Sequence, residues 1–136
     1  MTDINAAIAA AASGMRAQTV RMRIAAENVA NANSSGTDPN QDPFRRRIPL
    51  LESTTLASGA RGVQVTGATF DMSDFRQEYN PSHPAADANG YVQLPNVDTL
   101  VEMMDLREAT RAYEANLNMI EAARTMTNRA LDLLRR

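Results

Sequence analysis

The strongest constraint on the fold is that the chain contains neither glycine nor proline from Asn96 to Arg136. Without these helix breakers about 40 residues, or about 60 Å, can form one continuous helix. Asn96 or Asp98 can cap the amino terminus of this helix, and the acidic Asp98 and Glu102 favour that end electrostatically. We therefore predict a long carboxyl-terminal helix over this stretch.

One face of this helix carries residues that alternate three and four positions apart, as in the seam of a coiled coil. Met119, Met126 and Leu133 widen the seam on one flank, so the stripe is broad enough for more than one partner helix. Asn116 could fix the register of pairing, or it could be a tolerated, half-exposed residue. The seam consists of Leu106, Ala109, Tyr113, Asn116, Ile120, Ala123, Thr127, Ala130 and Leu134.

Residues 1–33 predict a second helix, because alanine dominates them and larger apolar residues recur every seven positions. Its stripe of small residues permits close approach of another helix but is too weak to hold this helix in isolation. We expect the two terminal helices to pair as an antiparallel coiled coil. The stripe consists of Ile8, Met15, Met22 and Val29, flanked by Ile4, Ala11, Gln18 and Ala25.

Between the helices, residues 34–95 predict a flexible loop followed by a small strand-rich insert, with strands over 47–53, 62–70 and 91–94. Val63, Val65 and Phe70 are expected to face a core, and the proline-containing segment 79–84 is expected to be a loop. The insert is expected to project from the far end of the helix pair. The fold class is therefore α+β, mainly α, with 96–136 as the second helical segment.

The composition excludes several classes of function. The chain has no cysteine, a net charge of -2 and no basic patch beyond 45–47, so it has neither thiol chemistry nor the footprint of a nucleic-acid-binding protein. The run 45–47 could bind a small anion, but protection of a strand edge is the favoured interpretation. The sequence predicts no membrane span and no cleaved signal peptide. Much of the 43% apolar content is alanine, which predicts a thin core.

No reactive constellation is visible. The single histidine, His83, lies in the predicted loop and is expected to be exposed to solvent. The spacing of Asp71, Asp74 and Asp87 matches no metal-binding loop, and carboxylates beside turns usually cap main-chain N–H groups. We therefore predict no catalytic residue, no metal site and no cofactor, and expect that the chain is not an enzyme.

Several segments resemble a known family. Ser13-Gly14-Met15 and residues 26–33, AENVANAN, resemble the amino-terminal signature shared by flagellar rod and hook proteins. Residues 79–92 and 94–98, which contain YNPSHPAADANGYV and LPNVD, resemble the hallmark of the proximal rod proteins in that family, and 111–117 continues the match. The loop 34–43 is longer than in many relatives, so no contact is carried over to it.

The resemblance implies export through the flagellar type III apparatus without signal cleavage, and packing of the terminal helices into a helical tube that crosses the periplasm. It implies contacts with copies of the chain, other rod proteins, and the inner-membrane ring and its adapter. Phe44 and Ile48 resemble an export-gate motif, although Phe44 could equally begin a strand. The expected assembly interface comprises Ile4, Ile8, Met15, Met22, Asn28, Val29, Asn31, Leu106, Tyr113, Asn116, Ile120, Met126 and Leu134.

A second hypothesis, a cytoplasmic coiled-coil adaptor or chaperone, requires the same helices but no polymer. The two hypotheses differ in the expected location of the protein. An adaptor stays inside the cell with soluble partners, whereas a rod subunit is found in the basal body.

Overall fold

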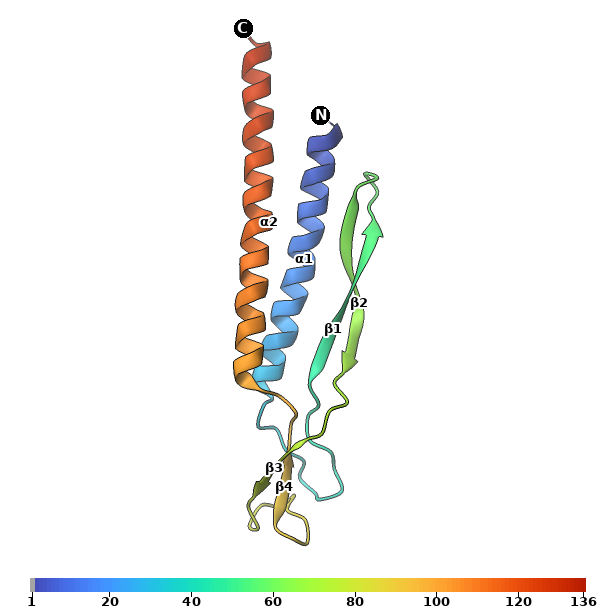
Figure 1. The fold of residues 1–136 in the computed structure, drawn as a ribbon, viewed down its shortest axis with the longest axis vertical. Coiled ribbons are helices and arrows are strands. Elements are labelled where there is room, and N and C mark those ends of the chain that lie inside the picture. The colour runs from blue at the N-terminus through green and yellow to red at the C-terminus, as the bar shows by residue number, and fades with distance from the viewer. Residues whose placement is uncertain (1) are drawn as a thin grey trace.

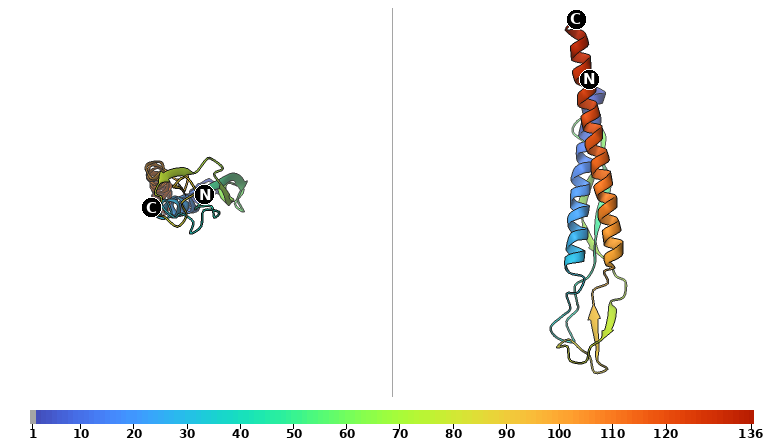
Figure 2. Two further views of the ribbon diagram at one scale, coloured as in Figure 1. Left: turned by 90° about the horizontal axis from the view of Figure 1, so that it is seen from below. Right: turned by 90° about the vertical axis from the view of Figure 1, so that its left-hand side faces the viewer.

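The computed structural model describes residues 2–136 as an elongated molecule built on two long antiparallel helices (Figures 1 and 2). Helix α1 spans Thr2–Ala30 and helix α2 spans Thr99–Leu134. The predicted α+β class, mainly helical with a small antiparallel strand region, is confirmed. Met1, the first residue of the predicted amino-terminal helix, lies outside the described residues.

Helix α2 begins where the sequence indicates. Asp98 is its N-cap, and the Asp98 carboxylate accepts a hydrogen bond of 3.0 Å from the main-chain N–H of Leu100. Such a cap satisfies one of the N–H groups that the first helical turn leaves without an intrahelical partner. Asn96, the alternative cap, has a different use at the base of the helices, described below.

The two helices pack closely because small residues lie between them. Ala11, Ala25, Ala109 and Ala123 are all buried. A Cβ atom on Gly14 would lie 2.7 Å from the side-chain nitrogen of Asn116, so the polar seam residue of α2 packs against the glycine of α1. Glycine therefore lets the helices approach where a larger residue would hold them apart.

Strands β1 (Arg47–Thr55) and β2 (Arg61–Phe70) form an antiparallel hairpin with a bulge opposite Leu50 and Leu51. The hairpin runs back alongside α1 (Figure 1), so the prediction that the whole insert projects from the far end is wrong. The expectation that Phe70 faces a core is also wrong, because this residue is 57% exposed, and Val63 is exposed as well, whereas Val65 is half-buried.

A polar contact between small residues holds the hairpin to the helix. The Ser13 hydroxyl is buried, donates to the carbonyl of Ala10 at 2.7 Å and accepts from the main-chain N–H of Val63 at 3.1 Å. Gly62 lies so close that a Cβ there would be 2.6 Å from the Ser13 oxygen. The hydrogen bond joins a serine hydroxyl to a main-chain N–H beside a glycine, which is why hydrophobic patterning did not indicate it.

We expect Gly62→Ala to lower the free energy of unfolding by about 1–3 kcal/mol, the usual cost of overpacking. The added methyl group must displace Ser13 or Leu56, and so it separates β2 from α1. Urea unfolding followed by circular dichroism measures the loss. In the double variant Gly62→Ala/Ser13→Ala the clash with the hydroxyl is gone, so the combined loss should be smaller than the sum of the two single losses. Strict additivity would contradict this packing.

A second, shorter hairpin closes the end of the molecule opposite the termini (Figure 1). Its strands are β3 (Arg76–Tyr79) and β4 (Tyr91–Leu94), whose terminal tyrosine rings meet edge to face at 5.4 Å. The sequence predicts β4 but not β3, because every residue of β3 is exposed and the segment shows no apolar alternation. The predicted turn before β4 is present, with Gly90 at φ +85°.

The buried residues of the described chain are mostly small, and alanines outnumber all larger apolar residues among them. The accessible surface is 9203 Å², whereas a compact protein of this mass exposes about 7,000 Å². The thin core and the large surface are therefore properties of the fold itself.

Candidate assembly interface

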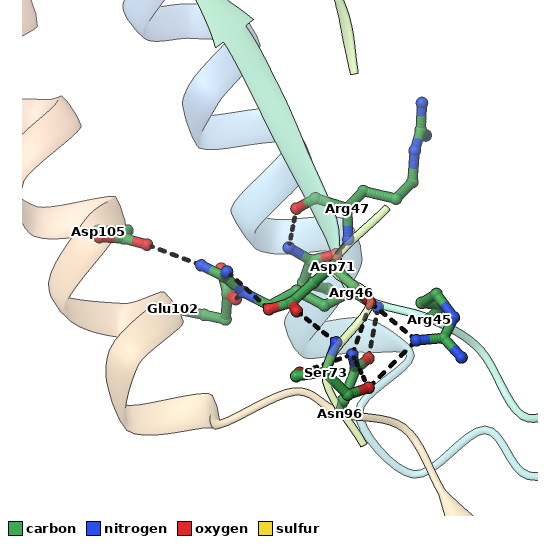
Figure 3. Close-up of polar contacts among 9 residues, drawn as sticks. Arg45, Arg46, Arg47, Asp71, Ser73, Asn96, Glu102 and Asp105 are labelled. Carbon is green, nitrogen blue, oxygen red and sulfur yellow. Dashed lines mark hydrogen bonds and ion pairs between the residues drawn. The ribbon is translucent and has the colours of Figure 1, made fainter. Parts of the chain in front are cut away.

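Three elements meet at the base of the helices, where Arg46 is the central side chain (Figure 3). Its guanidinium contacts three carboxylates: Glu102 through Nε, Asp71 at 3.4 Å and Asp105 at 3.4 Å. Glu102, in the first turn of α2, is 1% exposed. A charge this deeply buried is stable only with a partner, so Arg46 is required wherever Glu102 is ionised.

The arrangement also explains why an arginine serves here. One planar guanidinium presents several N–H donors, so it can reach Glu102 on α2 and Asp71 after β2 at once. Burial lowers the pKa of Arg46, but the hydrogen bonds and charges of Glu102 and Asp71 outweigh that effect and leave the pKa above its usual value. The base of α2 is thereby tied to the residue before β1, Arg46, and to the residue after β2, Asp71.

The neighbouring arginines add further ties. The Asn28 side chain, 1% exposed, exchanges two hydrogen bonds with the main chain of Arg47, and the Arg47 guanidinium pairs with Glu27 at 3.2 Å. Arg45 lies over the ring of Phe75 at 4.1 Å from its centroid. The interpretation of 45–47 as edge protection is therefore wrong for Arg46, whose charge is turned inward.

Asn96 completes the base of the helices (Figure 3). Its side-chain oxygen accepts from the main-chain N–H of Arg46 at 2.8 Å, and its nitrogen donates to the carbonyls of Asp71 and Ser73. The Asn96 amide thus joins the connection before α2 to the chain just before β1 and to the chain just after β2. The only sequence signal for this role is the Asn of the LPNVD string, whose position before α2 predicts a helix cap rather than a tie to the hairpin.

The pKa of Asp71 is lowered, first by hydrogen bonds from Ser73 and then by Arg46. A lowered folded-state pKa means that this carboxylate stabilises the fold above its unfolded pKa, about 3.9, and loses that contribution as the pH falls through the folded value.

We therefore expect Asp71→Asn to destabilise the chain at neutral pH and to flatten the fall in unfolding free energy below about pH 4. Urea unfolding at a series of pH values measures both effects. Asp74→Asn is the matched control, because Asp74 is exposed and forms no ion pair with a described arginine. An acid dependence in Asp71→Asn as steep as in the control would contradict this assignment.

His83 is half-buried, so its expected exposure to solvent is wrong. Its Nδ1 accepts from the N–H of Ala85 at 3.0 Å, which places the neutral ring's proton on Nε2, 3.2 Å from the Ser35 hydroxyl. A ring with its proton on Nε2 donates to Ser35 and cannot take the hydroxyl's proton, so this pair is not arranged as a nucleophile and base. The hydrogen bond between Ser35 and His83 joins the loop 34–43 to the β3–β4 connection.

The expectation that carboxylates beside turns cap main-chain N–H groups is confirmed for two of the three residues, Asp71 and Asp87. Asp71 accepts from the N–H of Ser73, and Asp87 accepts from the N–H groups of Asn89 and Tyr91. Across residues 2–136, no group of three or more acidic, histidine or cysteine side chains could hold a metal ion. Neither described helix is long and apolar enough to span a membrane.

The exposed surface of α2 carries a second apolar line, which we call the methionine stripe: Val101, Met104, Met119, Met126 and Leu133. Their exposed fractions range from 43% for Val101 to 72% for Leu133. At 100° per residue, this stripe lies about a quarter turn from the seam residues that face α1. The stripe has two parts, with Val101 and Met104 in the first turns of α2 and Met119, Met126 and Leu133 along its second half, so a subunit with α1 and the hairpin in place still presents apolar side chains on this face.

The structure divides the residues of the expected assembly interface into three groups. Asn28 and Asn31 form hydrogen bonds inside the subunit, to Arg47 and to Glu27. Met126 and Leu134 are exposed, at 61% and 83%. The remaining residues are half-buried: Ile4, Ile8, Met15, Met22, Val29, Leu106, Tyr113, Asn116 and Ile120. Of the export-motif pair, Phe44 and Ile48 are both half-buried in the folded chain.

Paired terminal helices, a strand-bearing insert and an exposed apolar stripe are the features expected of a structural subunit that assembles with other chains. The family described as flagellar basal body rod FlgEFG protein C-terminal matches residues 88–133. The flagellar basal-body rod protein FlgC of Agrobacterium fabrum is 44% identical, with 99% of this chain and 98% of that protein covered. FlgC of Bacillus subtilis and of Salmonella typhimurium are 39% and 36% identical, each with 90% of this chain and 92% of the relative covered. The chain belongs to the FlgC family of flagellar basal-body rod proteins.

Proposed function

We propose that the chain is a structural subunit of the proximal rod of the flagellar basal body, located in the periplasm and acting without catalysis. The observation that carries this proposal is the methionine stripe, exposed in a chain that belongs to a family of rod proteins. Isolated apolar side chains on a surface are common, but exposed apolar residues that recur on one face, as Met119, Met126 and Leu133 do over two heptads, are typical of a protein interaction site.

The subunits polymerise by packing of their terminal helices into a helical tube that transmits torque passively. The surface in excess of a compact protein, about 2,000 Å², is of the size that a stable protein interface buries. Neighbours are copies of the chain and other rod proteins, and at the inner-membrane end they include the basal-body ring and its adapter. The half-buried interface residues hold α1 to α2, and Met126 contacts a neighbour directly.

Export through the flagellar type III apparatus, without signal cleavage, precedes assembly. The thin, alanine-rich core supports this step, because a chain that gains little from burial is easily kept unfolded. Phe44 and Ile48 are half-buried in the fold, so the apparatus can read them as a motif only before the chain folds.

Mass spectrometry of detergent-extracted basal bodies tests the proposal. We expect the chain at several copies, together with other rod proteins, and its first residues present in the recovered peptides. Absence from basal bodies, with the protein in the cytosol among soluble partners, would support the adaptor hypothesis instead.

A further inference from the structure

The carboxyl-terminal end of α2 carries an apolar cluster that nothing covers among the described residues. Leu131, Leu133 and Leu134 are 47%, 72% and 83% exposed. This end rises past the described start of α1 (Figure 1). By helical periodicity, Leu131 and Leu134 lie on the same face as Ala109 and Ala123, which pack against α1. The seam face of α2 therefore continues beyond the described part of α1.

The same end is basic. Residues 124–136 contain four arginines and one aspartate. None of these arginines lies within 4.0 Å of a carboxylate in the part of the chain that the structure describes. We call residues Leu131, Leu133, Leu134, Arg135 and Arg136 the α2 tip.

The opposite end of the molecule is acidic. Its loops and the β3–β4 hairpin, residues 33–46 and 71–98, contain seven acidic side chains and three arginines. Of these acids, only Asp71 pairs with a described arginine. We call these two segments the strand end. Although the net charge of the chain is only -2, the molecule is basic at one end of its long axis and acidic at the other.

We propose that the α2 tip docks on an acidic strand end of the next rod subunit, of the kind that this chain itself carries, so that subunits stack head to tail. This inference rests on the proposed rod function and adds the contact that makes all subunits point in the same direction along the rod. The leucines are removed from water at the contact, and the tip arginines face carboxylates. Two tips, or two strand ends, repel each other, so only one orientation is favoured.

Head-to-tail contacts use two different surfaces, and such contacts generate open helical assemblies rather than closed dimers. A tube built along the long axis requires this type of contact. A basic, leucine-rich helix end could also lie on an anionic lipid surface. The strand end makes a protein the favoured occupant, because this same fold carries a matching surplus of negative charge.

A photoreactive benzoylphenylalanine at position 134, in cells that assemble flagella, tests the contact directly. After irradiation, mass spectrometry should map the cross-link to the strand end of a second copy or to the corresponding segments of another rod protein, and not to the β1–β2 hairpin. The control is the same residue at Met119, which is 55% exposed near the middle of α2, about 30 Å along the helix from Thr99, and should not reach a strand end. Cross-links from position 134 to helix sides, to the membrane ring or to lipid would overturn the proposal.

Charge reversal separates this contact from general packing. Arg135→Glu/Arg136→Glu should reduce the position-134 cross-link at least about tenfold, because like charges then meet at the contact. Arg107→Glu/Arg111→Glu reverses the same number of unpaired charges along the same helix and should change the yield by less than about twofold. Equal losses in the two variants would overturn the proposal.

The two proposals can fail separately. If the chain is present in basal bodies but the cross-link maps elsewhere, the head-to-tail contact is wrong and the rod function stands. If the chain is absent from basal bodies, both are wrong.

Discussion

Replacing Arg46 with methionine is expected to lower the free energy of unfolding by about 3 kcal/mol, near the low end of the cost of breaking a buried ion pair. Methionine keeps much of the length and apolar stem of the side chain but leaves the almost fully buried Glu102 without a counter-charge. Small domains are stable by only about 5–15 kcal/mol. The loss is therefore a large fraction of the total, and urea unfolding followed by circular dichroism should show it.

Two variants separate the buried charge from other causes. Arg47→Met removes an ion pair whose side chains are both 41% exposed, and it should cost less than about 1 kcal/mol. In Arg46→Met/Glu102→Leu no charge is left buried in the centre of the cluster, so much of the lost stability should return. If Arg46→Met costs no more than Arg47→Met, the central role of Arg46 is incorrect.

The helices and most of the strands could be predicted from sequence because their signals are local. The absence of glycine and proline, the cap at Asp98 and the heptad spacing define α2, and alternation defines β2 and β4. Antiparallel pairing followed from two compatible stripes. Each of these inferences needs only neighbouring residues and a known period.

The base of the helices could not be predicted, because its bonds join residues distant in sequence. Arg46 reaches Glu102, and Asn96 reaches Arg46 and Asp71. A run of three arginines gives no indication that one of them turns inward. Hydrophobic patterning also fails for the contact between Ser13 and Gly62, where small and polar groups hold the hairpin to α1. Its only sequence signals are a serine in the alanine-rich helix and a glycine near the start of β2.

Assembly and subunit stability can be separated on α2, because the seam and the methionine stripe lie on different faces. Ile120 is half-buried, so Ile120→Asp places a charge in the helix pair and should destabilise the subunit itself. Met126 is 61% exposed, so Met126→Asp should change the unfolding free energy by less than about 0.5 kcal/mol. A variant that folds normally but does not assemble would isolate the surface that neighbours cover.

We expect Met126→Asp to reduce swimming in soft agar to the level of a strain that lacks the gene, because the buried carboxylate would have no counter-charge in the assembled rod. Met103→Asp is the matched control: Met103 is 60% exposed on the same helix, roughly 160° around the axis from Met119. That variant should swim normally. Counting the chain in purified basal bodies shows whether loss of swimming reflects loss of assembly. Normal basal bodies in Met126→Asp cells would mean that the stripe faces solvent in the rod, and that the helices contact their neighbours through another face.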